Sequence, residues 1–316
     1  MRIVFMGTPE FAVTILDAIV QKGYEIAAVV TTPDKPAGRG LKLRPSAIKE
    51  YAVAHQLLVL QPEKLKDESF IQQLRNLQAD VFVVVAFRML PEVVFTIPPK
   101  GTFNVHASIL PNYRGAAPIH HAVMNGEVET GVTTFFLDKN MDTGDIIDTI
   151  RVPISPTATT GEMYQKLMEQ GAILTIRTLE KINNGTVRTQ PQPFIPFDQL
   201  KLAPKIFKED TYINWESPAQ NIFNKIRGLS PSPCACTRIR KIQGDIEQIK
   251  IFEAEIVHKP SRSAGTMEIM DSDKLVISTK TEKILIKSLQ IQGKTRLKCA
   301  DFLRGFHSEH YILKVF

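Results

Sequence analysis

The sequence has few of the features that mark disulfide-built or membrane-spanning chains. Its 316 residues contain three cysteines, and the spacing of Cys234 and Cys236 indicates neither a disulfide framework nor half of a paired metal site. No apolar run reaches the roughly 18 residues that a membrane helix needs. Residues 1–7 lack the long apolar stretch and cleavage site of a signal peptide. We therefore expect a cytoplasmic protein with no membrane association and no metal.

Two catalytic fingerprints are also missing. The apolar run at residues 2–6 is followed by Gly7 alone, where a dinucleotide site needs Gly-x-Gly-x-x-Gly, so an NAD-dependent oxidoreductase is disfavoured. There is no Gly-x-Ser-x-Gly nucleophile elbow. A covalent route through Ser108, two residues after His106, is the weaker alternative, because a strand followed by a loop matches that elbow poorly.

The remaining composition is that of a globular chain, with 43% apolar and 23% charged residues. Residues 2–6 and 25–31 read as strands on either side of a helix, for which Thr8 is the expected N-cap and Pro9 the first helical residue. This β-α-β opening predicts a mostly parallel sheet with a right-handed crossover. The apolar run at 80–86 is predicted to be a central strand. The pattern favours an α/β, Rossmann-like first domain.

The rest of the chain divides at a proline-rich stretch. Residues 189–205 carry four prolines and are interpreted as an extended linker between a first domain at 1–188 and a second at 206–316. In the second domain, short strands with frequent turns predict a small β-barrel. Residues 32–44, with two prolines and two glycines, are predicted to be a long loop without regular structure. Helices are expected at 45–55, 66–77, 119–124, 160–183 and 217–227, and further strands at 57–61, 133–137, 146–150, 234–240, 246–256, 265–270, 274–278 and 283–290.

Positive charge is unevenly distributed along the chain. The net charge is +6, and residues 206–316 hold 18 Lys and Arg against 13 Asp and Glu. A second basic stretch, in the predicted loop, contains Lys35, Arg39, Lys42 and Arg44. A polyanionic partner would explain both, but a solvated lysine-rich surface would explain them equally well on charge alone.

The most informative stretch is 101–118, which begins as a strand and breaks into a loop. Phe103 and Val105 alternate with Asn104 and His106, so the amide and the imidazole share one face. Asp142 follows in an acidic turn between two predicted strands. An amide donor, an imidazole and a carboxylate suit acyl transfer to an amine, with Asn104 stabilising an oxyanion and Asp142 orienting the imidazole. Each residue alone has a structural explanation as well.

Three motifs taken together resemble the 10-formyltetrahydrofolate-dependent formyltransferases. They are Asn-Val-His-Ala-Ser-Ile-Leu-Pro-Asn-Tyr-Arg-Gly-Ala-Ala-Pro-Ile at 104–119, Gly-Val-Thr at 131–133 and Met-Asp-Thr-Gly-Asp at 141–145. The resemblance implies direct attack of an amine on the formyl group of 10-formyltetrahydrofolate, with Asn104, His106 and Asp142 as the catalytic set. It also implies that the folate is contacted by Ser108, Ile109, Leu110 and Pro111 and by Arg88, Met89 and Leu90.

Further features resemble the members of that family that act on methionyl initiator tRNA. These are Phe-Met-Gly-Thr-Pro-Glu-Phe-Ala at 5–12, Pro-Asp-Lys-Pro-Ala-Gly-Arg-Gly at 33–40, Ile-Asn-Trp at 213–215 and Asp-Phe-Leu-Arg-Gly at 301–305. The resemblance implies tRNA contacts that include Lys35, Arg39, Lys42 and Arg44, and an OB-like C-terminal barrel. We expect a monomer. One departure is Ala-Phe-Arg at 86–88, where many relatives have Ala-Tyr-Gly. A sugar-nucleotide N-formyltransferase and a catalytically silent RNA-binding protein are the alternatives.

Overall fold

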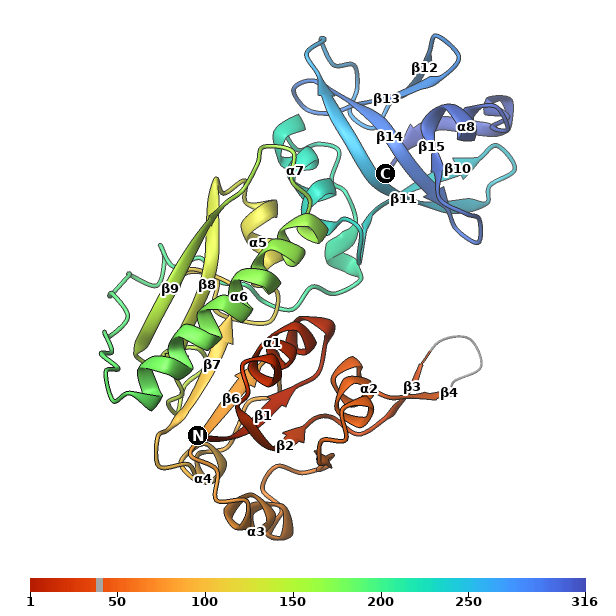
Figure 1. Cartoon of the computed structure of the whole chain (residues 1–316). Helices are drawn as coiled ribbons and strands as arrows, with labels where there is room; N and C mark the ends of the chain where they lie inside the picture. The colour runs from red at the N-terminus through yellow and green to blue at the C-terminus, as the bar shows by residue number, and fades with distance from the viewer. Residues whose placement is uncertain (38–41) are drawn as a thin grey trace. The chain divides into compact units, whose positions relative to one another are not determined.

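The structure, a computed structural model, describes residues 1–37 and 42–316, which form two compact units (Figure 1). The first unit consists of Met1–Gly115, Glu129–Pro153 and Tyr164–Leu202. The second consists of Ala116–Val128, Ile154–Met163 and Ala203–Phe316. The linker predicted at 189–205 thus runs mostly within the first unit. The division of the chain into domains 1–188 and 206–316 stays a prediction.

The first unit is built on a seven-stranded sheet in the order β5-β2-β1-β6-β7-β8-β9. The pairs from β5 to β7 are parallel, and β8 is antiparallel to both β7 and β9, which confirms the predicted mostly parallel sheet. Its strands are β1 (Arg2–Gly7), β2 (Glu25–Val30), β5 (Val59–Leu60), β6 (Val81–Val85), β7 (Thr102–His106), β8 (Glu129–Phe136) and β9 (Ile146–Pro153).

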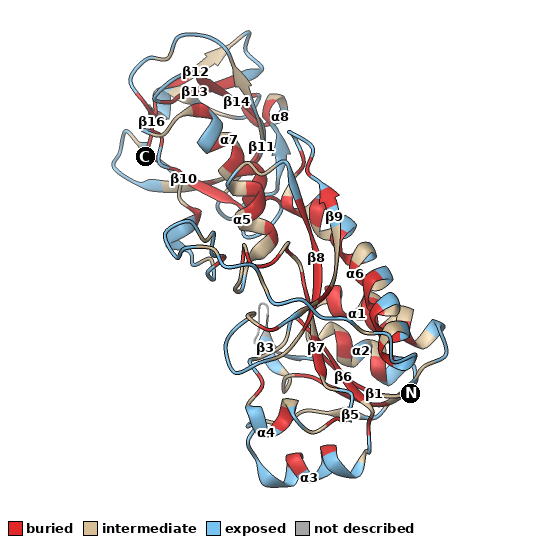
Figure 2. Cartoon of the chain, turned by 90° about the vertical axis from the view of Figure 1, so that its left-hand side faces the viewer, coloured by how far each residue is buried: buried red, intermediate tan, exposed pale blue. Residues whose placement is uncertain are grey.

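Helices cover both faces of this sheet, and the central strands β1, β6 and β7 are mostly buried. Those helices are α1 (Glu10–Gln21), α2 (Ala47–Ala54), α3 (Glu68–Asn76), α4 (Glu92–Phe95) and the body of α6 (Thr160–Asn183). Phe82 and Val84 of β6 pack against α3 and α4 on one face. On the other, Thr134 of β8 is hydrogen-bonded to Thr178 of α6. Figure 2 shows β1, β6 and β7 as the buried centre of the sheet.

The turn from β1 into α1 differs from the prediction. Pro9, not Thr8, is the N-cap residue of α1, and no side chain caps the helix. A Cβ atom on Gly7 would lie 2.6 Å from the Cβ of Ala12, so the strand and the helix meet too closely for a side chain. The missing side chain of Gly7 therefore allows the strand and the helix to pack closely at this turn, and this role requires no bound nucleotide.

The prediction that residues 32–44 lack regular structure was wrong. β3 (Lys35–Ala37) and β4 (Lys42–Arg44) pair as an antiparallel hairpin, with Lys35 opposite Arg44. Among the described residues, β3 and β4 form a sheet of two strands, so both are edge strands. Proline is tolerated at such an edge, and Pro36 does not prevent pairing. After the hairpin, the Ser46 side chain accepts from the Lys49 N–H and caps α2.

The second unit contains an antiparallel sheet in the order β12-β13-β14-β11-β10-β16, with β15 paired to β14. A bridge between Thr266 and Lys314 joins its two ends, so the sheet is nearly closed into a barrel, as predicted. Its strands are β10 (Ala235–Lys241), β11 (Ile246–Val257), β12 (Met267–Met270), β13 (Lys274–Ser278), β14 (Lys283–Ile291), β15 (Leu297–Lys298) and β16 (Tyr311–Val315). The helices of this unit are α5 (Pro118–Met124), α7 (Ala219–Leu229) and α8 (Cys299–Leu303).

Within the described part of the chain, no helix is both long and apolar enough to cross a bilayer.

Candidate active site

Strand β7 holds the two polar residues that the sequence singles out. Asn104 is in register with Val84 of β6, whose side chain packs on the α3 and α4 face, so Asn104 and His106 lie on that face. His106 is buried, with 7% of its surface exposed, whereas Asn104 is half-buried. Across residues 1–37 and 42–316, the Asn104 amide has no side-chain hydrogen bond, which leaves its N–H groups available to a ligand.

The imidazole of His106 is held by one nitrogen and open at the other. Nε2 lies 2.9 Å from the carbonyl oxygen of Tyr113, and because a carbonyl can only accept, Nε2 carries a proton. Nδ1 lies 3.9 Å from Oδ2 of Asp142, which is too long for a direct hydrogen bond. Neutral His106 therefore carries its ring lone pair on Nδ1, on the side of the Asp142 carboxylate.

Asp142 lies in the turn between β8 and β9, and its carboxylate is held by a backbone N–H group. Its backbone φ is +56°, a left-handed conformation that costs energy for a residue with a side chain. Oδ2 accepts a hydrogen bond of 3.0 Å from the Gly115 N–H, and the side chain is only 15% exposed. The structure thus brings together the predicted residues Asn104, His106 and Asp142.

The residues predicted to contact folate fall into two groups. In the first, 108–111, the Thr133 hydroxyl donates to the Ser108 carbonyl at 2.7 Å and lies 3.4 Å from the Leu110 N–H. Ser108 donates to the Asn112 carbonyl, Leu110 and Pro111 are buried, and Ile109 is half-buried. These bonds make 108–111 a fixed shelf beside His106.

The second group, Arg88, Met89 and Leu90, lines an open pocket of about 940 Å³ together with Lys66. Met89 is 63% exposed, and Leu90 is buried. The Arg88 guanidinium donates to the carbonyls of Pro62 and Glu63 at 2.8 and 2.9 Å, and burial lowers its pKa. Arg88 therefore ties its own loop to the loop after β5.

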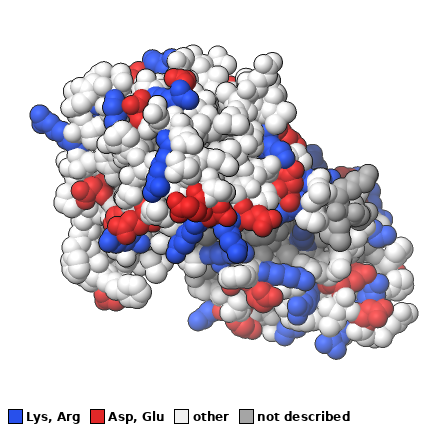
Figure 3. All heavy atoms as spheres, turned by 90° about the horizontal axis from the view of Figure 1, so that it is seen from below, with Lys and Arg blue, Asp and Glu red and all other residues white. Residues whose placement is uncertain are grey.

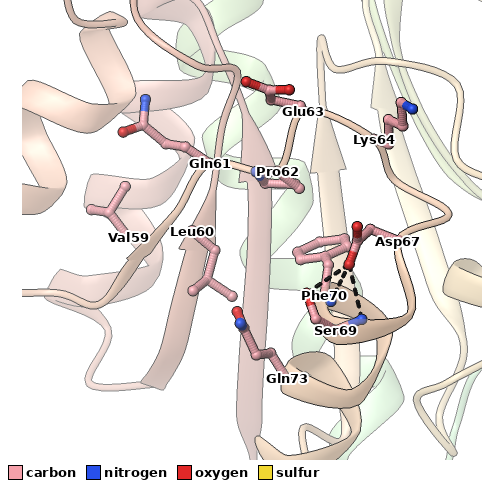
Figure 4. Close-up of a pocket in the computed structure, with 10 residues that line it drawn as sticks. All are labelled: Val59, Leu60, Gln61, Pro62, Glu63, Lys64, Asp67, Ser69, Phe70 and Gln73. Atoms are coloured by element: carbon pink, nitrogen blue, oxygen red, sulfur yellow. Dashed lines mark hydrogen bonds between the residues drawn. The ribbon is translucent and has the colours of Figure 1, made fainter.

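A second pocket, of about 500 Å³, lies between that loop and α3 (Figure 4). Asp67 lines it, and its carboxylate accepts from the N–H groups of Ser69 and Phe70, so this side chain is occupied as the N-cap of α3. None of the predicted site residues lines this pocket.

The basic residues predicted to contact tRNA lie on the β3–β4 hairpin. Lys35 and Arg44 are exposed and opposite each other. Arg39 lies outside the described residues, and Lys42 is described only by its backbone pairing with Ala37. On the face seen in Figure 3, Lys and Arg are interspersed with Asp and Glu.

Comparison with known proteins identifies the family. Residues 1–179 match the formyl transferase family, and residues 205–307 match the formyl transferase C-terminal domain. The methionyl-tRNA formyltransferase of Bacteroides fragilis is 48% identical over 309 residues, which cover 97% of this chain and 95% of that protein. The enzyme of the same name from Bacteroides thetaiotaomicron is 47% identical over 308 residues, with coverages of 97% and 96%. The chain belongs to the methionyl-tRNA formyltransferase family.

A solved structure outside that family shows how widely the fold is shared. A sugar 3N-formyl transferase, crystallised in the presence of dTDP and 5-N-formyl-THF, has a TM-score of 0.65 and 20% identity. The match covers 93% of this chain and 99% of that one. At this identity the likeness shows the fold alone, so the family membership rests on the sequence relatives.

Some residues that hold this site were not predicted from the sequence. The contacts of Tyr113 with His106 and of Gly115 with Asp142 come from backbone atoms, which no side-chain pattern reveals. Thr133 stood inside a recognised motif, but its hydroxyl contacts depend on the register of β8 with β7. Gln192 lies in the proline-rich stretch interpreted as a linker, yet it contacts the Asp142 turn. The individual roles of the predicted site residues stay predictions.

Proposed function

We propose that this protein transfers the formyl group of 10-formyltetrahydrofolate to the α-amino group of methionyl initiator tRNA. The observation that carries the proposal is the similarity to methionyl-tRNA formyltransferases along nearly the whole chain, at 47–48% identity. The His106–Asp142 pair beside a free Asn104 amide supports it, because this set suits acyl transfer without a covalent enzyme intermediate.

In the proposed reaction, the neutral methionyl amine attacks the formyl carbon bound to N10 of the folate. A C–N bond forms, the C=O double bond opens to an oxyanion, and the Asn104 amide donates to that oxygen. The attacking nitrogen passes a proton to Nδ1 of His106, and the resulting imidazolium faces Asp142. The oxyanion then collapses, the C–N10 bond breaks, and the proton returns to N10. Formylmethionyl-tRNA and tetrahydrofolate leave.

We further propose that the β3–β4 hairpin and the C-terminal barrel bind the tRNA. Lys35 and Arg44 stand exposed on the hairpin, and residues 206–316 carry most of the net positive charge, which suits phosphate contacts. Arg39, which lies outside the described residues, is proposed to contact the tRNA as well. The folate would lie over the 108–111 shelf, with the loop at 88–90 and the Asp142 turn beside it. The protein would act as a cytoplasmic monomer.

A product analysis tests the proposal. The protein is incubated with 10-formyltetrahydrofolate labelled in its formyl carbon and with methionyl initiator tRNA, and the aminoacyl ester is then hydrolysed. Labelled N-formylmethionine is the expected product, in an amount matching the tetrahydrofolate formed. The same reaction with deacylated tRNA is the control. Release of labelled formate without formylmethionine would contradict the proposal.

A further inference from the structure

The side chain of Gln192 is fully engaged at the turn that carries Asp142. Its Nε2 donates to the Asp142 carbonyl at 2.8 Å and to the Gly144 carbonyl at 2.9 Å. A primary amide has two N–H groups, so both are used, and both hold the backbone of the same turn. The side chain is half-buried although it comes from a stretch rich in proline.

The oxygen of the same amide is engaged as well. Oε1 accepts from Nε of Arg114 at 3.2 Å and from Nη2 at 2.6 Å, a charge-assisted pair of contacts. Gln192 therefore joins the Asp142 turn to the loop that follows β7.

Arg114 stands between the two residues that fix the catalytic side chains. The carbonyl of Tyr113 accepts from His106, and the N–H of Gly115 donates to the carboxylate of Asp142. Tyr113 thus holds the His106 imidazole, Arg114 holds Gln192, and Gly115 holds the Asp142 carboxylate. A shift of the Asp142 turn relative to this tripeptide would change the 3.9 Å separation of Nδ1 and Oδ2.

The turn needs such support because its conformation is costly. Asp142 adopts a φ of +56°, and a non-glycine residue keeps that conformation only where its surroundings determine it. Gln192 is itself placed by a backbone pair, in which the N–H groups of Ile146 and Gln190 donate to each other's carbonyls at 2.8 and 2.9 Å. A side chain anchored to β9 thereby fixes the backbone on which the carboxylate stands.

We propose that Gln192 is a positioning residue for formyl transfer, holding the Asp142 carboxylate at its distance from His106. This inference rests on the proposed function. Gln192 does not touch the reacting atoms. It acts through two backbone carbonyls and through Arg114, so its loss should slow the chemical step while leaving the binding of tRNA intact.

The variant Gln192→Glu separates positioning from simple anchoring. Glutamate has nearly the same shape and still accepts from Arg114, with an added charge that strengthens this contact. It has no N–H, however, and its oxygens would face the carbonyls of Asp142 and Gly144. We expect kcat to fall at least about tenfold, with KM for the tRNA within about twofold, as for the loss of an interaction that acts in the transition state.

The matched control is Gln190→Glu, which makes the same change of charge at an exposed side chain two residues earlier. It should keep the wild-type kcat. If Gln192→Glu also kept it, Gln192 would only anchor the segment to Arg114, and the inference would be overturned.

Amide hydrogen exchange gives a readout that does not depend on activity. The Gly115 N–H is protected by the Asp142 carboxylate, so it should exchange faster in Gln192→Glu than in the wild type or in Gln190→Glu. Unchanged exchange at Gly115 would overturn the inference. If the wild-type protein transferred no formyl group, the proposed function would fail, and the exchange result would still report on the contact between Gln192 and the turn.

Discussion

At the scale of single residues, the imidazole of His106 is oriented by its own loop. Nε2 is occupied by the Tyr113 carbonyl, which leaves Nδ1 as the nitrogen that can take a proton. The same hydrogen bond fixes the ring plane, and Asp142 lies on the Nδ1 side. In the proposed reaction, Nδ1 of His106 is therefore the nitrogen that would take up the proton.

Replacing this residue should affect turnover and not binding. We expect His106→Ala to lower the rate of formyl transfer by roughly 10²-fold or more, which is the scale of general acid–base catalysis, with the tRNA affinity nearly unchanged. The control is His55→Ala, because His55 is exposed and its ring stacks on Tyr51 of its own helix, away from strand β7. Weakened tRNA binding with normal turnover at saturation would refute the assigned role.

A second residue-scale prediction concerns Cys234, which the sequence showed only as part of a Cys-x-Cys pair. Burial, aided by the neighbouring Cys236, raises the pKa of the Cys234 thiol to about 12. In the folded protein the thiol is thus protonated well above the pH at which an unfolded cysteine ionises, and the thiolate is the reactive form. We expect no alkylation of Cys234 by iodoacetamide at pH 8 in the native state and rapid alkylation after unfolding, as measured by mass spectrometry of the peptide. Native labelling at a rate like that of a free thiol would contradict this.

Residues of the candidate site were predictable where the type of side chain and its spacing along the sequence together indicate a chemical role. Asn104 and His106 alternate with apolar partners on one strand, and Asp142 follows in an acidic turn, so type and spacing were enough to single them out. Gln192 could not be found in this way. Its function depends on a path of the chain that brings residue 190 beside residue 146, and no local pattern encodes that pairing.

At the scale of elements, caps and apolar periods located most helices, and the errors have physical causes. The predicted helix at 160–183 has the observed bounds of α6. Near the N-terminus, Pro9 and not the predicted Thr8 is the N-cap residue of α1, a difference of one residue at a helix end. The β3–β4 hairpin was missed because proline and glycine suggest loops, although an edge strand tolerates proline, which β3 contains at Pro36. The closing strand β16 was missed although its Tyr-Ile-Leu-Lys-Val sequence is a short strand pattern.

The hairpin leads to a prediction about tRNA. The double variant Lys35→Ala/Arg44→Ala should raise KM for methionyl-tRNA and flatten the dependence of log affinity on log salt by roughly one to two units, because two phosphate contacts are removed. Arg39→Ala should act in the same direction. Folate binding should stay intact in each variant.

The control for the hairpin is Lys100→Ala, which removes one exposed positive charge from the loop before β7. It should leave the salt dependence unchanged. The hairpin assignment fails if the double variant keeps the wild-type slope, and an equal loss of folate and tRNA binding would instead indicate misfolding.

Strand β16 leads to a prediction about stability. It pairs with β10, and Val315 is 2% exposed in the barrel core. Deleting residues 311–316 removes this pairing and the bridge that joins the sheet's ends, so the thermal midpoint of the C-terminal unit should fall by at least about 5 °C. Ile312→Ala, at a half-exposed position on the same strand, should change it by less than about 2 °C. An unchanged midpoint in the truncated chain would show that β16 adds nothing to the barrel, and calorimetry measures both.

At the scale of the whole molecule, the fold does not select the acceptor. A sugar 3N-formyl transferase shares it at a TM-score of 0.65 and 20% identity. The choice of methionyl-tRNA rests instead on relatives at 47–48% identity along nearly the full chain, and it agrees with the net charge of +6 and its concentration in residues 206–316. A polyanion would be attracted to such a chain, whereas a small sugar nucleotide needs only a few contacts.

The ratio of kcat/KM for methionyl initiator tRNA to kcat/KM for an amino sugar nucleotide tests the central claim most directly. Both are measured with 10-formyltetrahydrofolate as donor, at the same salt concentration, by the release of tetrahydrofolate and by analysis of the formylated product. We predict a ratio of at least about 10³, because the loss of most binding contacts to the correct substrate removes several kcal/mol from the transition state. A ratio below one would contradict the account and make the sugar nucleotide the acceptor.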